Sequence, residues 1–163
     1  MEYICHYHSP LGGITLAGGE NALTGLWFDG QKNFAETLRE AYTEASLPVF
    51  AETCRWLDIY FSGRDPGFTP ALNPGGTEFR RAVWEILLTI PYGGTITYGE
   101  IASRLADRTG NSHVSSSAVG GAVGHNPVAL IVPCHRVIGA NGKLTGYAGG
   151  LDKKIKLLEL ERI

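Results

Sequence analysis

The chain has 163 residues, of which 44% are hydrophobic and 18% charged, a composition typical of an ordinary globular protein. No apolar run approaches the ~20 residues of a membrane helix, and the start MEYICHYHSP lacks the pattern of a secretory signal. We therefore expect a cytoplasmic protein with no membrane partner. The cysteines (Cys5, Cys54 and Cys134) are too few and too scattered for a disulfide framework.

The charge is unevenly distributed along the chain. The net charge of −2, taken alone, argues against nucleic-acid binding. Residues 1–76 carry four basic and nine acidic side chains, whereas residues 77–163 carry ten basic and seven acidic ones. Because phosphate binding depends on local charge, the C-terminal half is the candidate for contact with a polyanion.

The first half of the chain predicts a sheet followed by helices. Three short apolar segments, separated by Gly-rich turns, predict an antiparallel meander. They are YICHYHS (3–9), GGITLAG (12–18) and ALTGLWF (22–28). Helical spacing predicts two helices, over residues 32–43 and 48–62. Pro and Gly residues break the pattern over 63–76, so we expect two domains, residues 1–76 and 77–163.

The second half begins with the pattern of a capped helix. Thr77 is placed to cap it, and apolar residues recur along one face. These are Phe79, Val83, Ile86 and Leu87. A second helix is predicted from Thr97, and a third over the small-residue segment SSSAVGGAV (115–123). Two short helices joined by a loop are the outline of a helix-turn-helix.

The remaining C-terminal segments complete an α+β fold. VALIVP (128–133) predicts a buried strand, ANGKLTG (140–146) a hairpin placed like a wing, and residues 150–163 a terminal helix. The fold class expected is therefore an N-terminal antiparallel-sheet domain followed by a C-terminal helical domain with a winged helix-turn-helix-like unit.

The stretch IVPCHRV places Cys134, His135 and Arg136 side by side at the end of an apolar run. A free thiol has a pKa near ~8.5, and a neighbouring base increases its thiolate fraction. The alternative is an inert buried thiol. Polar groups at the end of an apolar segment require a partner, which favours a reactive site, with Arg136 in a structural role.

A helical wheel of the terminal helix suggests a partner for His135. Its inner face is formed by Leu151, Ile155 and Leu158. Glu161 falls inside this apolar arc, whereas Lys153, Lys154 and Lys156 lie largely outside it. A buried carboxylate needs a partner, and a Glu–His–Cys relay resembles a catalytic triad. A solvated glutamate near the chain end fits the wheel equally well.

Two further features have two interpretations each. The predicted helix over residues 115–123 is rich in small residues, which suits either close approach to a target or tight helix packing. These small residues include Ser117, Ala118, Gly120 and Gly121. Tyr98, at a predicted helix start, is placed either to contact a nucleic-acid backbone or to fill the core.

Three motifs together carry a specific resemblance. They are TYGEIA (97–102), AVGGAVGHNPVALIVPCHRVIG (118–139) and GKLTGYAGGLDKKIKLLELE (142–161). They closely resemble the O6-alkylguanine-DNA alkyltransferases, also called methylated-DNA–protein-cysteine methyltransferases. The match is strong over residues 77–163. The first half is similar to the family's ribonuclease H-like domain only in pattern.

The resemblance implies DNA repair by direct reversal. The alkyl group of O6-alkylguanine, mainly O6-methylguanine and with O4-methylthymine as a further candidate, passes irreversibly to Cys134. His135 resembles the water-linked base, Glu161 its carboxylate partner, and Asn126 the residue that braces the turn beside the cysteine. The backbones of Cys134 and Val137 match those that accept a hydrogen bond from the exocyclic amine of the base.

The resemblance also implies how DNA is held. The partner is double-stranded DNA entered through the minor groove by the small-residue helix, bound by a monomer without a cofactor. Tyr98 matches a tyrosine that crowds the target phosphate and helps to flip the base. Tyr147 matches a hydrogen-bond or proton donor to the flipped guanine, and Gly149 and Gly150 match glycines that shape the loop closing the pocket.

Two positions depart from the family pattern. Ser117 stands where the family usually has an Arg that fills the gap left by the flipped base. We expect weaker base extrusion, or a substitute such as Arg108 or His113. Ala148 stands where many members have Ser, which removes a hydroxyl near O6 but leaves the Ala148 backbone N–H.

Other classes of protein fit fewer features of the sequence. A lesion sensor of the alkyltransferase-like type would replace Cys134, typically with Trp. A Cys-His hydrolase or redox protein would require an oxyanion site or a second nearby thiol, and no CxxC occurs. Cys5 and Cys54, with nearby histidines, match no standard zinc spacing, so we predict no metal and place both cysteines in the core.

Overall fold

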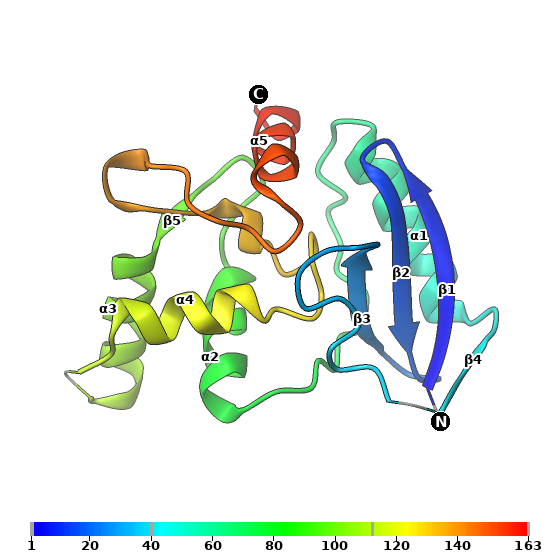
Figure 1. Cartoon of the computed structure of the whole chain (residues 1–163), viewed down its shortest axis with the longest axis horizontal. Coiled ribbons are helices and arrows are strands. Elements are labelled where there is room, and N and C mark those ends of the chain that lie inside the picture. The colour runs from blue at the N-terminus through cyan, green and yellow to red at the C-terminus, as the bar shows by residue number, and fades with distance from the viewer. Residues whose placement is uncertain (1, 40, 112, 163) are drawn as a thin grey trace.

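The computed structural model describes residues 2–39, 41–111 and 113–162. The N-terminal half forms a sheet with one long helix behind it, and the C-terminal half forms a cluster of helices beside that sheet (Figure 1). The terminal helix lies between the two halves at the top of the view. This arrangement confirms the α+β fold class.

The N-terminal meander is confirmed. Strands β1 (Glu2–Ser9), β2 (Gly12–Gly18) and β3 (Leu23–Phe28) pair antiparallel in sequence order. Strand β4 (Tyr42–Glu44) adds to the free edge of β1 in parallel, so the sheet is mixed, with order β3-β2-β1-β4. Helix α1 (Pro48–Phe61) is also as predicted, with Pro48 in its first turn.

The helix expected over residues 32–43 is wrong. Residues 32–37 form consecutive turns, and the end of the segment belongs to β4. Asn33 and Ala35 have φ values of 61° and 52°, in the left-handed region that an α-helix excludes. Tertiary contacts outweigh helix propensity here, because Asn33 donates its side-chain N–H to the Gly124 carbonyl 3.1 Å away.

The three predicted helices that open the C-terminal half are confirmed. They are α2 (Glu78–Leu87), α3 (Tyr98–Thr109) and α4 (Ser116–Gly124). Thr77, Thr97 and Ser115 cap them, each accepting a backbone N–H with its side-chain oxygen. Phe79 is a correction: it is 37% exposed, because it lies in the first turn of α2, outside the buried stripe.

The buried strand expected over residues 128–133 is also wrong. The segment is buried but folds into turns, with the Ile131 N–H donating to Ala129 and Leu130 at a φ of 69°. The Asn126 side chain holds these turns, accepting from the Val128 N–H at 3.0 Å and donating to the Val132 carbonyl at 2.8 Å. An apolar run of this length does not distinguish a strand from a buried turn.

The predicted wing is a loop. The short strands β5 (Ile96–Thr97) and β6 (Val137–Ile138) pair in parallel, and the 3₁₀ turn η2 (Ala140–Gly142) follows. A hydrogen bond of 2.7 Å from the Gly139 N–H to the Lys143 carbonyl closes the loop without a paired hairpin.

Helix α5 (Leu151–Leu160) confirms the predicted terminal helix, although its orientation differs from the wheel. Leu151, placed on the inner face, is 44% exposed. The buried residues of this helix are Lys154 and Leu157, and Glu161, its C-cap, is buried as well. The inner face therefore carries two charged groups.

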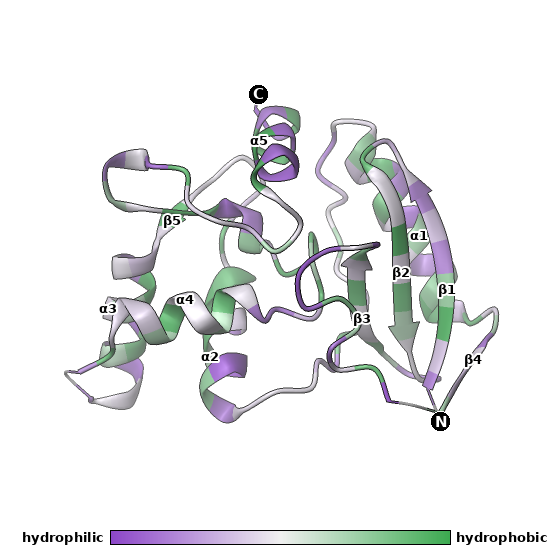
Figure 2. Ribbon diagram, viewed as in Figure 1, coloured by the Kyte–Doolittle hydropathy of each residue, from purple (hydrophilic) through white to green (hydrophobic). Residues whose placement is uncertain are grey.

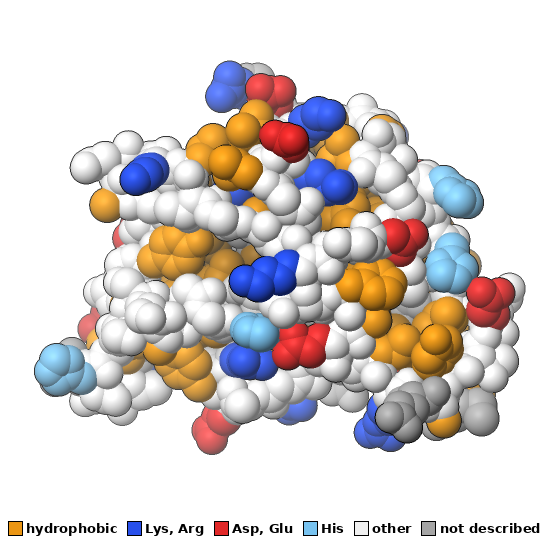
Figure 3. Space-filling model, viewed as in Figure 1, with side chains coloured by type: hydrophobic (Ala, Val, Ile, Leu, Met, Phe, Trp, Pro, Cys, Tyr) orange, Lys and Arg blue, Asp and Glu red, His pale blue; other side chains and the backbone are white. Residues whose placement is uncertain are grey.

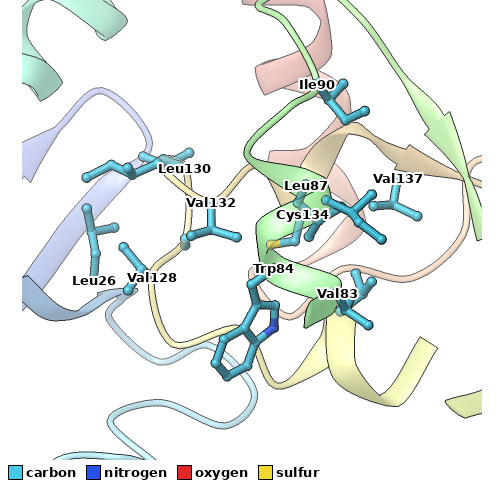
Figure 4. Close-up of a cluster of buried hydrophobic side chains, with 14 of the residues drawn as sticks. Leu26, Val83, Trp84, Leu87, Ile90, Val128, Leu130, Val132, Cys134 and Val137 are labelled. Carbon is cyan, nitrogen blue, oxygen red and sulfur yellow. The ribbon is translucent and has the colours of Figure 1, made fainter. Parts of the chain in front are cut away.

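One hydrophobic core extends through both halves of the chain. Apolar residues follow β2, β3 and the inner turns of the helices (Figure 2). Leu26 of β3 bridges to Val128, which joins the sheet to the turns before Cys134 (Figure 4). Among the described residues, no helix is long and apolar enough to cross a membrane.

Candidate active site

The candidate nucleophile lies on the 3₁₀ turn η1 (Cys134–Arg136), directly after the Asn126-braced turns. Its side chain lies beside α2, among Leu87, Trp84 and Val137 (Figure 4). The Cys134 N–H donates to the Val132 carbonyl at 2.8 Å, so the turn fixes the cysteine backbone. Cys134 is 5% exposed, which places its thiol in an apolar and nearly dry environment.

Glu161 is the centre of a buried hydrogen-bond network. Its Oε2 accepts a hydrogen bond from His135 Nε2 and a second one, of 2.5 Å, from the Tyr60 hydroxyl. Its Oε1 accepts from Arg136 Nε at 2.7 Å and from the Gly93 N–H at 3.2 Å. With four donors around it, Glu161 is the partnered carboxylate rather than the solvated chain-end residue of the alternative.

This network also sets the protonation states of its members. Burial raises the pKa of Glu161, but other contributions outweigh it and lower the pKa to about 2. These are hydrogen bonds from His135 and Arg136, the charge of Arg136, and the charge that His135 acquires when it is protonated in acid. Burial lowers the pKa of His135, although the Glu161 carboxylate opposes this shift. The pair is therefore an anionic glutamate and a neutral imidazole at neutral pH.

The second ring nitrogen of His135 is left free by the contact with Glu161. Because Nε2 carries the hydrogen donated to Glu161, the neutral ring has its lone pair on Nδ1. His135 Nδ1 and the Tyr147 hydroxyl are both buried, and neither finds a hydrogen-bond partner among the described residues. Burial raises the pKa of Tyr147, and the nearby Cys134 sulfur raises it further, so Tyr147 keeps its proton.

Cys134 rests as a thiol. Burial raises its pKa, while the Asn126 amide and the positive charge of Lys154 act in the opposite direction. A buried thiol is a weak general nucleophile, so reaction requires a base to take its proton. His135, held by Glu161, is the candidate base.

Lys154 is a site residue that the wheel misplaced. It was expected largely outside the apolar arc, but its side chain is 0% exposed. Its Nζ donates to the carbonyls of Val137 at 2.5 Å and Thr145 at 3.2 Å. Burial lowers the pKa of Lys154, and the nearby Cys134 sulfur acts in the opposite direction. Its spacing of three and seven residues from Leu157 and Glu161 is the sequence signal that indicates one shared face.

A cavity of about 390 Å³ opens next to Cys134. Its wall includes Tyr98, Gly120 and Gly121 from the helix-turn-helix, and Tyr147 and Ala148 from the loop before α5. The N-terminal half also contributes, through residues 32 and 33. Their position was missed because a helix was expected there.

Lys32 and Asn33 are each held by another segment of the cavity wall. The Lys32 N–H donates to the Ala148 carbonyl at 3.0 Å, and the Asn33 side chain reaches Gly124 at the end of α4. His125, at that helix end, pairs with Glu36 at 2.9 Å. Basic, His and acidic side chains meet near the centre of the face in Figure 3, where the two halves adjoin.

The small residues of α4 form an open surface beside the cavity. A second hollow, next to the first, is lined by Tyr98, Gly120 and Ser117 together with other residues of α3 and α4. Tyr98 and Gly120 border both hollows, and the Tyr98 hydroxyl is 3.0 Å from Thr145 Oγ1. A side chain added at Gly121 would meet no heavy atom within 4 Å, so its surface is open to a partner.

The two glycines after Ala148 have structural reasons to be glycine. A Cβ at Gly149 would lie 2.7 Å from the Tyr147 ring, closer than real contacts allow. Gly150 has a φ of 100°, which side chains rarely adopt, and it begins α5. Together they let the loop turn beneath Tyr147 into the helix that carries Lys154.

Comparisons with known proteins agree with this geometry. The family description "6-O-methylguanine DNA methyltransferase, DNA binding domain" matches residues 78–163, and its "ribonuclease-like domain" matches residues 3–74. The chain belongs to the 6-O-methylguanine DNA methyltransferase family. The first half of the chain, in which the sequence showed only a similarity of pattern, therefore also matches the family, through its ribonuclease-like domain.

Individual relatives of the family cover nearly the whole chain. A methylated-DNA–protein-cysteine methyltransferase of Methanosarcina acetivorans is 49% identical, over 98% of this chain and 97% of its own length. One from Mycobacterium bovis is 44% identical, over 96% and 92%. The crystal structure of Mycobacterium tuberculosis OGT in complex with DNA has a TM-score of 0.84 and 46% identity, covering 98% of this chain and 92% of that one.

The structure also places the positions where this chain departs from the family pattern. Ser117 is exposed on α4. Arg108, one suggested substitute, pairs with Glu85 at 3.0 Å, and His113 lies on the other side of α4. Neither belongs to the described residues lining the Cys134 cavity, which instead include Lys32. Val137 is not in that lining either, and its carbonyl already accepts from Lys154.

Proposed function

We propose that this chain repairs DNA by transferring the alkyl group of O6-alkylguanine, mainly O6-methylguanine, to Cys134. The observation that carries the proposal is the buried thiol at the base of a cavity, beside a neutral imidazole held by an ionised glutamate. Family membership supports the same reaction, since the relatives bear the name methylated-DNA–protein-cysteine methyltransferase.

The chemistry follows from the protonation states. The Cys134 sulfur attacks the alkyl carbon, the bond from that carbon to O6 breaks, and its electrons remain on the guanine. The thiol proton passes to the free Nδ1 of His135, and Glu161 stabilises the imidazolium that forms. Tyr147, still protonated, offers its hydroxyl to the leaving base. The thioether is not reversed, so each molecule acts once.

The geometry requires that the base leave the duplex. A thiol that is 5% exposed cannot reach O6 of a stacked guanine, so the nucleotide must flip into the cavity at a cost of a few kcal/mol. The open surface of α4 suits close approach to the minor groove, with Tyr98 between that surface and the cavity. Asn126 is proposed to keep the nucleophile in place.

The proposal needs one copy of the chain. We infer a monomer, because the cavity and the four donors to Glu161 are complete within one copy and the proposed reaction requires no partner residue. Three free thiols suit a reducing compartment, and we infer a cytoplasmic location.

Intact-protein mass spectrometry tests this function directly. After mixing with a duplex containing one O6-methylguanine, we expect a single gain of about 14 Da, one methyl group on a thiolate nucleophile. Cys134→Ser should bind the duplex without any gain, and unmodified duplex should leave the wild-type mass unchanged. Tight lesion binding by the wild type with no gain in mass would overturn transfer.

A further inference from the structure

Two half-buried cysteines lie in the N-terminal half, away from the proposed reaction. Cys5 is on β1 and Cys54 on α1, and both pack against the edge of the core. Figure 1 shows α1 behind β1 and β2, with β1 and α1 both running from the lower to the upper part of the view. The two elements are in direct contact.

A neighbouring contact fixes the register between strand and helix. The Tyr7 hydroxyl donates to Asp58 Oδ1 at 2.5 Å. Cys5 and Tyr7 share one face of β1 and are separated by about 6.6 Å along the strand. Cys54 and Asp58 share one face of α1, one helical turn apart, about 6 Å along its axis. Because these steps nearly match, the Tyr7–Asp58 contact brings Cys5 opposite Cys54.

The electrostatics of the two thiols agree with this register. The Cys5 thiol, as hydrogen-bond donor, lowers the pKa of Cys54 to about 7, although burial and the Asp58 charge oppose the shift. The same contact, burial and the charge of Glu44 raise the pKa of Cys5. Cys54 is thus the sulfur that ionises first, with a protonated thiol beside it.

We propose that Cys5 and Cys54 form a reversible disulfide that links β1 to α1. A metal site is a poorer use of the pair, since no three His, Cys, Asp or Glu side chains within residues 2–39, 41–111 and 113–162 are arranged to hold an ion. The inference stands on the strand–helix register and does not depend on alkyl transfer.

The oxidant is a low-molecular-weight disulfide, represented by glutathione disulfide. The Cys54 thiolate attacks one of its sulfurs, which forms a mixed disulfide and releases one glutathione thiolate. Cys5 then loses its proton, and its sulfur displaces the second glutathione from Cys54. Two electrons pass from the protein thiols to glutathione disulfide, and two molecules of glutathione leave.

Mass spectrometry and thermal unfolding of the full chain test the proposal. Treatment with glutathione disulfide should lower the mass by about 2 Da and give a cross-linked peptide containing Cys5 and Cys54. Closing this long loop should raise Tm by several degrees, and dithiothreitol should reverse both changes. Transfer to an O6-methylguanine duplex should be unchanged, since Cys134 is buried and remains free.

Two single variants separate this reaction from general thiol oxidation. Cys5→Ser should stop at a mixed disulfide on Cys54, a gain of about 305 Da for one bound glutathione. Cys54→Ser should react much more slowly, because the pKa of Cys5 is raised. The proposal is wrong if wild-type protein stays unreacted, retains glutathione on Cys54, or forms its cross-link through Cys134.

Discussion

The cavity has a floor and a rim that are built differently. The floor, as we call the buried polar cluster next to Cys134, consists of Tyr60, His135 and Arg136 around the Glu161 carboxylate, together with Lys154, which donates to backbone carbonyls. The rim consists of residues open to solvent on one side, among them Lys32, Tyr98 and Gly121. In the floor, each group sets the charge state or position of another. On the rim, we expect each residue to contact DNA independently of the others.

This difference indicates how substitutions should behave. A change in the floor leaves a buried charge or carbonyl without its partner, so it should damage both stability and the chemical step. A change on the rim leaves no buried group without its partner, so it should alter DNA affinity alone. Single substitutions in each region test this division, and the largest effect is expected in the floor.

Glu161→Gln should slow alkyl transfer by roughly 10³-fold, because the neutral amide no longer stabilises the His135 imidazolium. Single-turnover transfer at saturating lesion duplex measures it, with the fold checked by circular dichroism. Glu159→Gln, on the exposed side of α5, is the matched control and should transfer normally. Tyr60→Phe should fall in between, since it removes one of four donors to the carboxylate. A normal rate in Glu161→Gln would remove Glu161 from the proposed mechanism.

The same carboxylate makes stability depend on acid pH. Its pKa is about 2 when folded and about 4.3 when unfolded, so the folded state favours the ionised form. This contribution, about 3 kcal/mol, is fully present above the unfolded value and is lost as pH falls through about 2. Urea unfolding between pH 6 and pH 3 should show wild type losing more stability than Glu161→Gln. Parallel curves would mean that the carboxylate is not held as the contacts indicate.

Lys154→Met tests the part of the floor that the helical wheel misplaced. Without the ammonium, the carbonyls of Val137 and Thr145 lose their donor, a cost of about 2 kcal/mol. The pKa of Cys134 should also rise, because the Lys154 charge lowers it, and transfer at neutral pH should slow. Lys156→Met, on the exposed face of α5, should change neither quantity. Equal urea midpoints for the two variants would count against a structural role for Lys154.

The floor could be predicted from sequence only in part. The wheel placed Glu161 inside the apolar arc, and the residues suggested His135 as its partner; the structure pairs the two. The wheel placed Lys154 largely outside that arc, although its spacing from Leu157 and Glu161 indicates the same face. Its burial depends on two carbonyls from separate segments, and no local pattern reveals those. Tyr60 lies far away in the sequence and gave no signal at all.

The rim was harder to predict, because tertiary contacts decide its backbone. Residues 32–37 have helical spacing, but left-handed conformations at Asn33 and Ala35 and contacts with Gly124 and Ala148 hold them as turns. The capped helices were predictable because Thr77, Thr97 and Ser115 are local signals that need no tertiary partner. Local chemistry therefore determined the capped helices, and long-range contacts determined the turns that reach the cavity.

Lys32→Gln should have the smallest effect, on DNA affinity alone. Lys32 lines the cavity from the acidic N-terminal half, and α4 carries Ser117 where the family resemblance predicts an Arg. Loss of one phosphate contact should weaken lesion binding about three- to fivefold and reduce the slope of log K against log salt by about 1. Fluorescence anisotropy over a salt series measures both, with Lys156→Gln as the control of equal charge.

At saturating duplex the transfer rate of Lys32→Gln should match wild type, since the rim does not touch the thiol proton. An unchanged salt slope would show that Lys32 makes no phosphate contact, and a slower rate at saturation would show that the rim and floor are coupled.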